Sequence, residues 1–484
     1  MQGWCPRARA LRHVHYETEK RTPCPETSAD KPCVELLVNF KSELFSSTFS
    51  YGLISIVRLV GSLVLTRLLT PEAYGIFAII FSLMTMIELL SDVGSRGLLI
   101  RHPRGKEARF VHTLWTMRLI RSGLNFCAMF FGAPLIAVIY HQPILTDALK
   151  MLSLVFLLSG LESMSFILAI RDRKSRIANY TELVSIAVMT GVSISLAFIL
   201  KNHFAVIIGV LAQRALLTLA SYFFYRNIGV GIAFDREAMA DQFRFARFVL
   251  PSSLLYMVVS QYDKVILLRL FDLSLLGVYG LASNLNSPVA GVIVHNAQTI
   301  LYARCADYFR ADRASACLRY YRENRRLLLL GVTLPAALAG FSRSIVAILY
   351  DRRYVAAGFI LMVLGLGSVI TAFQNASENL LVASGRTHTI LVANVIRVCS
   401  LIPATLIGYF LFGFSGFLWF TLLASVPVLA YYYQQQRKLG LLNWSYELKL
   451  LLIALAVFLI CLAASHTLMS LVPADSLHLR LRRR

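Results

Sequence analysis

The sequence predicts an all-α polytopic membrane protein, with two six-helix lobes related by a parallel pseudo-repeat plus one extra C-terminal helix. Of its 484 residues, 57% are hydrophobic and 15% are charged, whereas soluble domains have a lower apolar share and a higher charged share. The apolar residues form blocks of about 20, and a helix of that length crosses a hydrocarbon core about 30 Å thick. Short charged turns separate the blocks. This pattern indicates membrane spans rather than the core of a soluble protein.

Thirteen blocks are predicted to be spanning helices. The first six lie at 44–68, 75–93, 113–139, 148–170, 179–200 and 204–225. The others lie at 247–268, 275–301, 326–349, 356–380, 388–411, 416–434 and 450–472. The predicted domains are a disordered cytoplasmic tail (1–40), a first lobe (41–226), a cytoplasmic linker (227–246), a second lobe (247–436), and an extra helix with a basic tail (437–484).

An internal repeat supports the two-lobe prediction. The turn after the first predicted helix reads RLLTPEAYG from Arg67 to Gly75, and the turn after the seventh reads RLFDLSLLG from Arg269 to Gly277. In each copy an aromatic residue follows two positions after the glycine. An offset of six helices preserves the orientation in the membrane, so the copies run parallel. Parallel repeats are typical of transporters whose halves rock about a shared site.

The distribution of cations predicts the topology. The loops after even-numbered helices carry 24 Lys and Arg residues and the loops after odd-numbered helices carry 5, which places the even loops and the N-terminus in the cytoplasm. The net charge of +22 follows from this asymmetry and does not indicate nucleic-acid binding. Thirteen spans would place Arg480 and Arg482–Arg484 on the translocated side, so 12, 13 or 14 spans stay open.

Five stretches in a characteristic order carry a resemblance to a known family. They are LTRLLTPEAYGIFAI (65–79), LLSDVG (89–94), AIRDRKSRIANYTELV (169–184), QYDKVILLRLFDLSLLGVYGLASNL (261–285) and ASENLLVASGRTHTILVANVIRV (376–398). The chain resembles the polysaccharide flippase family, the Wzx-type branch of the multidrug/oligosaccharidyl-lipid/polysaccharide exporter superfamily. The resemblance implies transfer of an undecaprenyl-diphosphate-linked oligosaccharide from the cytoplasmic to the periplasmic leaflet by alternating access. The tail at 1–40 has no recognised counterpart.

A lipid-linked sugar with a diphosphate requires a cationic cavity within the membrane. Arg58, Arg214 and Arg397 all fall near the centre of predicted spans, where a charge is costly and by default faces the protein interior. Arginine donates two hydrogen bonds to phosphate oxygens, which makes these residues candidates for binding a diphosphate. The alternative is that each pairs with a carboxylate, and Glu162 lies deep enough to be such a partner.

Asp263 and Lys264, toward the outer end of the seventh predicted helix, form a second candidate group. Adjacent residues point about 100° apart on a helix, so we expect that the two do not simply neutralise each other. Asp263 is a candidate for binding a coupling cation or proton, and Lys264 for contacting substrate. The alternative is an interfacial charge pair with Arg269. The coupling or gating candidates are Asp263, Glu88, Glu162 and Glu378.

The eighth predicted helix is unusually polar. Asn284, Asn286, Asn296 and Gln298 are amides of the kind that bind sugars, and we expect them to form a glycan-contacting face. Pro288 should kink the helix or free a carbonyl group. His295 has no second His or Cys at helical spacing, so no metal site is predicted.

The remaining observations narrow the class of protein. No GxxxxGK[ST] loop occurs, so ATP is not the direct driving force, and we expect no cofactor. An enzyme of lipid-linked glycans would need a large translocated loop, and every odd loop is short. The alternatives that stay open are a lipid II-type flippase and a cation-coupled drug antiporter, although an antiporter for cations favours a carboxylate-rich cavity. The expected partners are the lipid-linked glycan, membrane lipid, and the polymerase and glycosyltransferases of the pathway, with no nucleic acid and a monomeric state.

Overall fold

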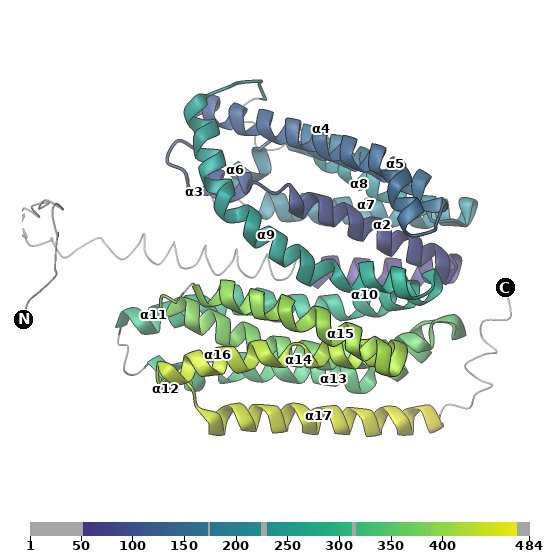
Figure 1. Ribbon diagram of the computed structural model, residues 1–484, viewed down its shortest axis with the longest axis vertical. Coiled ribbons are helices and arrows are strands. Elements are labelled where there is room, and N and C mark those ends of the chain that lie inside the picture. Colours follow the sequence, from purple (N-terminus) through teal and green to yellow (C-terminus); the bar gives the residue numbers. More distant parts are fainter. Residues whose placement is uncertain (1–51, 173–174, 224–229, 312–315, 387, 472–484) are drawn as a thin grey trace, which may run out of the picture. The chain divides into compact units, whose positions relative to one another are not determined.

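The computed structural model describes residues 52–172, 175–223, 230–311, 316–386 and 388–471, and every regular element in these ranges is a helix (Figure 1). The predicted all-α membrane fold is therefore confirmed. The predicted tail at 1–40 and the basic residues Arg480–Arg484 lie outside the described residues.

The first half of the chain begins with a helical segment at 52–68 and continues through seven further helices. They are α2 (Pro71–Leu90), α3 (Ser95–Arg101), α4 (Ala108–Ile139), α5 (Ile144–Leu161), α6 (Ser165–Arg171), α7 (Ser175–Leu200) and α8 (Phe204–Phe223). The start of α2 shows why the chain turns there. Thr70 accepts a hydrogen bond from the Ala73 backbone through its side chain, and Pro71 occupies the first helical position, where its missing N–H costs nothing.

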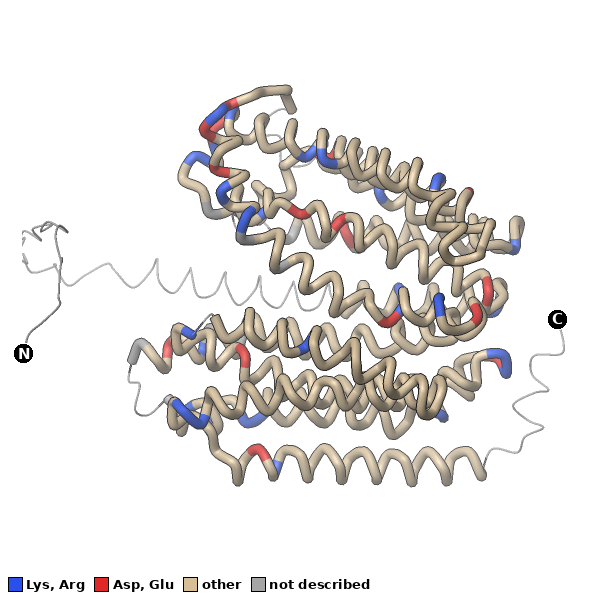
Figure 2. The backbone as a smooth tube through the Cα atoms, in the orientation of Figure 1, with Lys and Arg blue, Asp and Glu red and all other residues tan. Residues whose placement is uncertain are grey.

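The second half contains α9 (Arg236–Leu270), α10 (Leu273–Asn296), a π-helical turn (Ala297–Leu301), α11 (Tyr302–Ala311), α12 (Ala316–Glu323), α13 (Arg325–Leu349), a 3₁₀ turn (Arg352–Tyr354), α14 (Ala356–Ala383), α15 (His388–Leu423), α16 (Val426–Lys438) and α17 (Trp444–Leu471). α13 packs against both α14 and α17 (Figure 1). Long middle stretches of many helices carry no charged residue, and most Lys, Arg, Asp and Glu residues lie toward helix ends (Figure 2).

Ten helices within the described residues are long and apolar enough to cross a membrane. Three differences separate this number from the thirteen predicted spans. The described part of the first helix, 52–68, is short, α10 is polar, and the stretch His388–Lys438 contains two predicted helices. Between those two, Gly413 adopts a left-handed conformation with φ +61°, which bends the chain.

The predicted continuous helix at 148–170 is wrong, because the structure breaks it. α5 ends at Leu161 and α6 begins at Ser165, and the intervening residues leave helical geometry. The side chain of Glu162 accepts a hydrogen bond from Arg118 at 2.8 Å, and the Ser163 N–H donates to the Ser221 hydroxyl at 2.9 Å. These partners on α4 and α8 satisfy groups that the break would otherwise leave unpaired.

The two copies of the sequence repeat meet each other at the start of α2 and α10. A Cβ atom built on Gly75 would lie 2.1 Å from the carbonyl oxygen of Leu273, and one built on Gly277 would lie 2.0 Å from that of Pro71. Both contacts are closer than any side chain allows. The glycines thus permit a reciprocal backbone contact between the two repeats. We call the helix end at which α2 and α10 begin the outer end.

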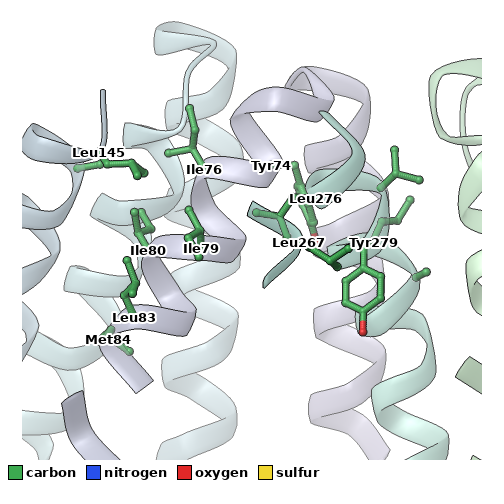
Figure 3. Close-up of a cluster of buried hydrophobic side chains, with 14 of the residues drawn as sticks. Tyr74, Ile76, Ile79, Ile80, Leu83, Met84, Leu145, Leu267, Leu276 and Tyr279 are labelled. Atoms are coloured by element: carbon green, nitrogen blue, oxygen red, sulfur yellow. The ribbon is translucent and has the colours of Figure 1, made fainter. Parts of the chain in front are cut away.

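The largest hydrophobic core lies around this contact. It joins buried side chains of α2, α4, α5, α8, α9, α10, α13, α14 and α15 (Figure 3). In Figure 3, Ile79, Ile80 and Leu83 of α2 form one part of the core, while Tyr74 and Leu276 lie where α2 meets α10. Apolar residues from both halves of the chain therefore pack together around the repeat contact.

Candidate functional site

A cavity of about 270 Å³ lies beside the repeat contact. Its walls come from the helical segment 52–68 and from α2, α7, α8 and α10, so both halves of the chain contribute. The polar residues in its lining are Ser55, Arg58, Ser62, Tyr74, Thr190, Ser193, Gln213, Asn284 and Ser287. Among the described residues that line it, none is Asp, Glu or Lys.

Arg58 is the one charged residue in this described lining. The structure exposes it, and within the described part of the chain it forms no ion pair. An unpaired guanidinium in a largely apolar wall attracts an anion, because few other charges or dipoles compete for it. The cavity therefore has the chemistry of an anion-binding site.

The amide of Asn284 lies in the same cavity. Its Nδ2 donates to the Tyr74 hydroxyl at 2.8 Å, and that hydroxyl also lies 3.3 Å from the hydroxyl of Ser62. This leaves the Asn284 carbonyl oxygen as an acceptor at the wall. The structure thus places Arg58 and Asn284, two of the predicted site residues, in the lining of one cavity.

The other two predicted arginines do not line this cavity. Arg214 follows Gln213, which does line it. Arg397 on α15 donates to Gln374 Oε1 on α14 at 3.0 Å. Glu378, also on α14, accepts from the Tyr432 hydroxyl at 2.7 Å. The structure therefore places Arg397 and Glu378 in a separate polar cluster between α14, α15 and α16.

The structure does not show the alternative in which Glu162 pairs with Arg58, Arg214 or Arg397. Glu162 pairs with Arg118 of α4, and both side chains are mostly buried, with exposed fractions of 17% and 16%. Sequence reasoning missed Arg118 because it counted cations only in loops and at span centres. The available signal was its position: the predicted span 113–139 contains Arg118, and a charged residue inside a span by default faces the protein interior.

Arg121 lies one helical turn beyond Arg118 and was also missed. It donates to the carbonyl oxygen of Ser91 at 3.3 Å and lies 3.8 Å from Asp92. Asn125 donates to the Ser91 hydroxyl at 2.8 Å. These contacts join α4 to the end of α2. Because the acids Asp92 and Glu88 both lie near Arg121, this cluster does not suit an anionic ligand.

Asp263 and Lys264 approach each other more closely than helix geometry alone predicts. The Lys264 ammonium lies 3.7 Å from Asp263 Oδ1, and the Tyr279 hydroxyl donates to Asp263 Oδ2. The lysine also donates to the Ser260 carbonyl, so the two residues approach each other although their positions point about 100° apart on the helix. That they do not simply neutralise each other stays a prediction. Arg269 instead contacts the Ile139 carbonyl and His141, so it does not form the alternative pair.

The four amides of the eighth predicted helix do not share one cavity. Asn286 exchanges hydrogen bonds with Ser368 of α14 at 2.9 and 3.1 Å, and Gln298 is exposed. Asn296 lines a second, mostly apolar cavity of about 130 Å³ between α10, α13, α14 and α17. Successive helix positions rotate by about 100°, and the π-helical turn after Asn296 adds to the spread.

A network outside the spans holds the chain before α9 in place. Arg104 contacts Glu107 at 2.6 Å, Asp235 at 2.7 Å and Glu237 at 2.9 Å. The hydrogen bond from Arg104 holds the pKa of the Asp235 carboxyl below its usual range. These contacts attach the predicted linker, through Asp235 and Glu237, to the loop before α4.

Comparison with known proteins identifies relatives of the chain. The profile of a family described as polysaccharide biosynthesis protein matches residues 64–358. The teichuronic acid biosynthesis protein TuaB of Bacillus subtilis (strain 168) is 22% identical over 337 residues, which are 69% of this chain and 69% of TuaB.

Solved structures of transporters share the fold. The lipid II flippase MurJ in an inward closed conformation aligns with a TM-score of 0.63 at 14% identity, over 90% of this chain and 99% of MurJ. An inward-facing multidrug resistance MATE family transporter of the MOP superfamily aligns with a TM-score of 0.60 at 14% identity, over 81% of this chain and 95% of that one. At these identities the likeness concerns the fold alone.

Proposed function

The chain belongs to the polysaccharide biosynthesis protein family and is a multi-pass membrane protein of flippase or transporter type, and we propose that it translocates a polyprenyl-diphosphate-linked oligosaccharide. In this proposal the lipid carrier is undecaprenyl, and the glycan moves from the cytoplasmic to the periplasmic leaflet of a bacterial inner membrane. The N-terminus and the even loops face the cytoplasm, following the cation asymmetry of the loops.

The observation that carries the proposal is Arg58 in a cavity without acidic residues in its described lining. A diphosphate presents oxygens that accept paired hydrogen bonds from a guanidinium. Asn284 and the hydroxyls of Ser62 and Ser287 offer donors and acceptors to the first sugar. The apolar part of the wall, including Phe77 and Phe81, suits the lipid chain.

The rival function as a cation-coupled drug antiporter has less support. A cationic substrate requires a carboxylate, and the described lining of this cavity has an arginine instead. A lipid II-type flippase would handle the same diphosphate chemistry. The match to a polysaccharide biosynthesis family and the similarity to TuaB favour a polysaccharide precursor over lipid II.

Substitution of Arg58 tests the proposal. Charge-assisted hydrogen bonds contribute about 1.5–3 kcal/mol each, so Arg58→Ala should reduce export about 100-fold, whereas Arg58→Lys keeps the charge and should retain part of it. Polymer export would be measured in a strain that lacks the chromosomal copy, with membrane insertion checked by immunoblot. Arg326→Ala, at an exposed position at the start of α13, is the matched control. Full export by Arg58→Ala would refute a diphosphate site there.

The roles of Arg214, Arg397 and Lys264 stay predictions. If the substrate contacts them during its passage, alanine at each position should lower export without loss of the protein from the membrane. Export at the normal level in all three variants would confine substrate binding to the cavity around Arg58.

A further inference from the structure

Three tyrosines meet at the outer end of the core. Tyr74 comes from α2, Tyr350 from the residue after α13, and Tyr354 from the 3₁₀ turn that follows. Their exposed fractions are 5%, 7% and 0%. The rings of Tyr350 and Tyr354 lie 6.3 Å apart, edge to face, and all three belong to the core that surrounds the repeat contact.

Their hydroxyl groups are in different situations. The Tyr74 hydroxyl has Asn284 and Ser62 as partners. The Tyr350 hydroxyl approaches Ser62 without completing a hydrogen bond, and the Tyr354 hydroxyl has no partner among the described residues. Buried hydroxyls nearly always find a partner, and leaving one unpaired is costly. In this conformation a phenylalanine at either position would fill the same space without burying an unpaired hydroxyl. We therefore expect the two hydroxyls to form hydrogen bonds in another conformation.

The position of the pair suggests a partner for these hydrogen bonds. Tyr74 and Ser62 line the Arg58 cavity. Tyr350 and Tyr354, which belong to the loop between α13 and α14, lie in the same core as Tyr74. The backbone contact between Gly75 and Gly277 lies directly after Tyr74 in α2. The two hydroxyls therefore lie near both the cavity and the contact between α2 and α10.

We propose that Tyr350 and Tyr354 form a saccharide-binding subsite that is buried here and opens when the outer ends of α2 and α10 separate. Tyrosine rings pack against the apolar face of a pyranose, and their hydroxyls both donate to and accept from sugar hydroxyls. Neither Tyr350 nor Tyr354 carries a positive charge, so the pair of side chains offers a diphosphate no cation. The ligand of this subsite is therefore the glycan and not the phosphate. The inference rests on the proposed function.

The test is the double variant Tyr350→Phe with Tyr354→Phe. Loss of two hydrogen bonds to the glycan should lower polymer export about tenfold. The midpoint of thermal unfolding of the purified protein in detergent should stay the same or rise, because no hydrogen bond of this conformation is lost. Tyr432→Phe is the buried control. Its hydroxyl bonds to Glu378, so its unfolding midpoint should fall.

Tyr256→Phe, at a tyrosine that is 61% exposed on α9, should change neither measurement. Normal export by the double variant would overturn the subsite, and so would a loss of export that parallels a loss of stability. A second measurement is the labelling of Tyr354→Cys, without the native cysteines, by a membrane-impermeant maleimide in cells. We expect labelling while glycan is being made. Absence of labelling under that condition would also overturn the subsite.

The Arg58 variants separate this inference from the proposed function. If Arg58→Ala is inactive and the tyrosine variant is fully active, the diphosphate site stands and the outer subsite falls. If Arg58→Ala is fully active, the proposed function itself fails, whatever the tyrosine variant does.

Discussion

At the scale of single residues, burial separates charges that support the fold from charges that are available to a ligand. Arg118 pairs with Glu162, and Arg121 contacts Ser91 and Asp92. Arg58 lines the cavity and forms no ion pair with another described residue. The same residue type therefore has opposite roles within one half of the chain, and the difference lies in which neighbours the fold supplies.

The Arg118–Glu162 pair makes a quantitative prediction. Arg118→Ala leaves Glu162 mostly buried without its partner, which should reduce the free energy of unfolding by about 3–5 kcal/mol. The double change Arg118→Met with Glu162→Met removes both charges and should recover most of that loss. Thermal or denaturant unfolding in detergent would measure both. If the double variant were no more stable than Arg118→Ala, the unpaired charge would not be the cause.

Asp235 predicts an effect of pH. Arg104 lowers its pKa in the folded protein, so the contact contributes stability above the ordinary pKa of an aspartate, near 4, and that contribution is lost as pH falls through the lower folded value. Proteolysis of the segment before α9 should therefore be constant between about pH 5 and 8 and rise only in stronger acid. Asp235→Asn should raise proteolysis between about pH 5 and 8 and remove most of the further rise in acid. A rise near pH 6 in the normal protein would show that another group is responsible.

At the scale of helices, the two copies of the repeat meet in a backbone contact at the starts of α2 and α10. Gly75 and Gly277 let two backbones touch where any side chain would separate them. Tyr74 next to Gly75 reaches the cavity, and Leu276 next to Gly277 enters the core. The two repeats thus supply both the closure and part of the site behind it.

Gly75→Ala with Gly277→Ala tests the closure. Each new methyl group would overlap a carbonyl oxygen, and overpacking of this kind costs about 1–3 kcal/mol per site. The unfolding midpoint should fall, and Tyr354→Cys should become reactive to an impermeant thiol reagent even without transport. Gly132→Ala on α4, where nothing lies within 4 Å of the added atom, is the control and should be neutral. An unreactive cysteine in the glycine variant would show that this contact does not hold the outer end closed.

At the scale of the whole molecule, the polar clusters fall into separate regions. One surrounds Arg58, another surrounds Arg397 and Glu378, and a third joins Asp263 to Lys264 and Tyr279. An ionisable residue inside a span is by default functional, and Asp263 lies beside Lys264. We therefore retain Asp263 as the candidate for coupling.

Proteoliposomes provide the test of coupling. If Asp263 binds the coupling ion, an imposed proton or sodium gradient should accelerate transport by the normal protein, and Asp263→Asn should remove the acceleration. Asp147→Asn, at an exposed acid near the start of α5, is the control. Equal rates with and without both gradients in the normal protein would exclude gradient coupling.

The sequence by itself determined the all-α membrane fold, most of the apolar helices and the recurrence of the Arg–Gly segment, because apolar length, turn residues and repeats are local properties of the chain. It also singled out Arg58 and Asn284 as candidates. Only the tertiary structure decided that these two share a cavity, that Glu162 breaks its helix to meet Arg118, and that Gly75 meets Gly277. Each of these facts depends on which helix faces a given side chain, and that choice is made by packing between segments far apart in sequence.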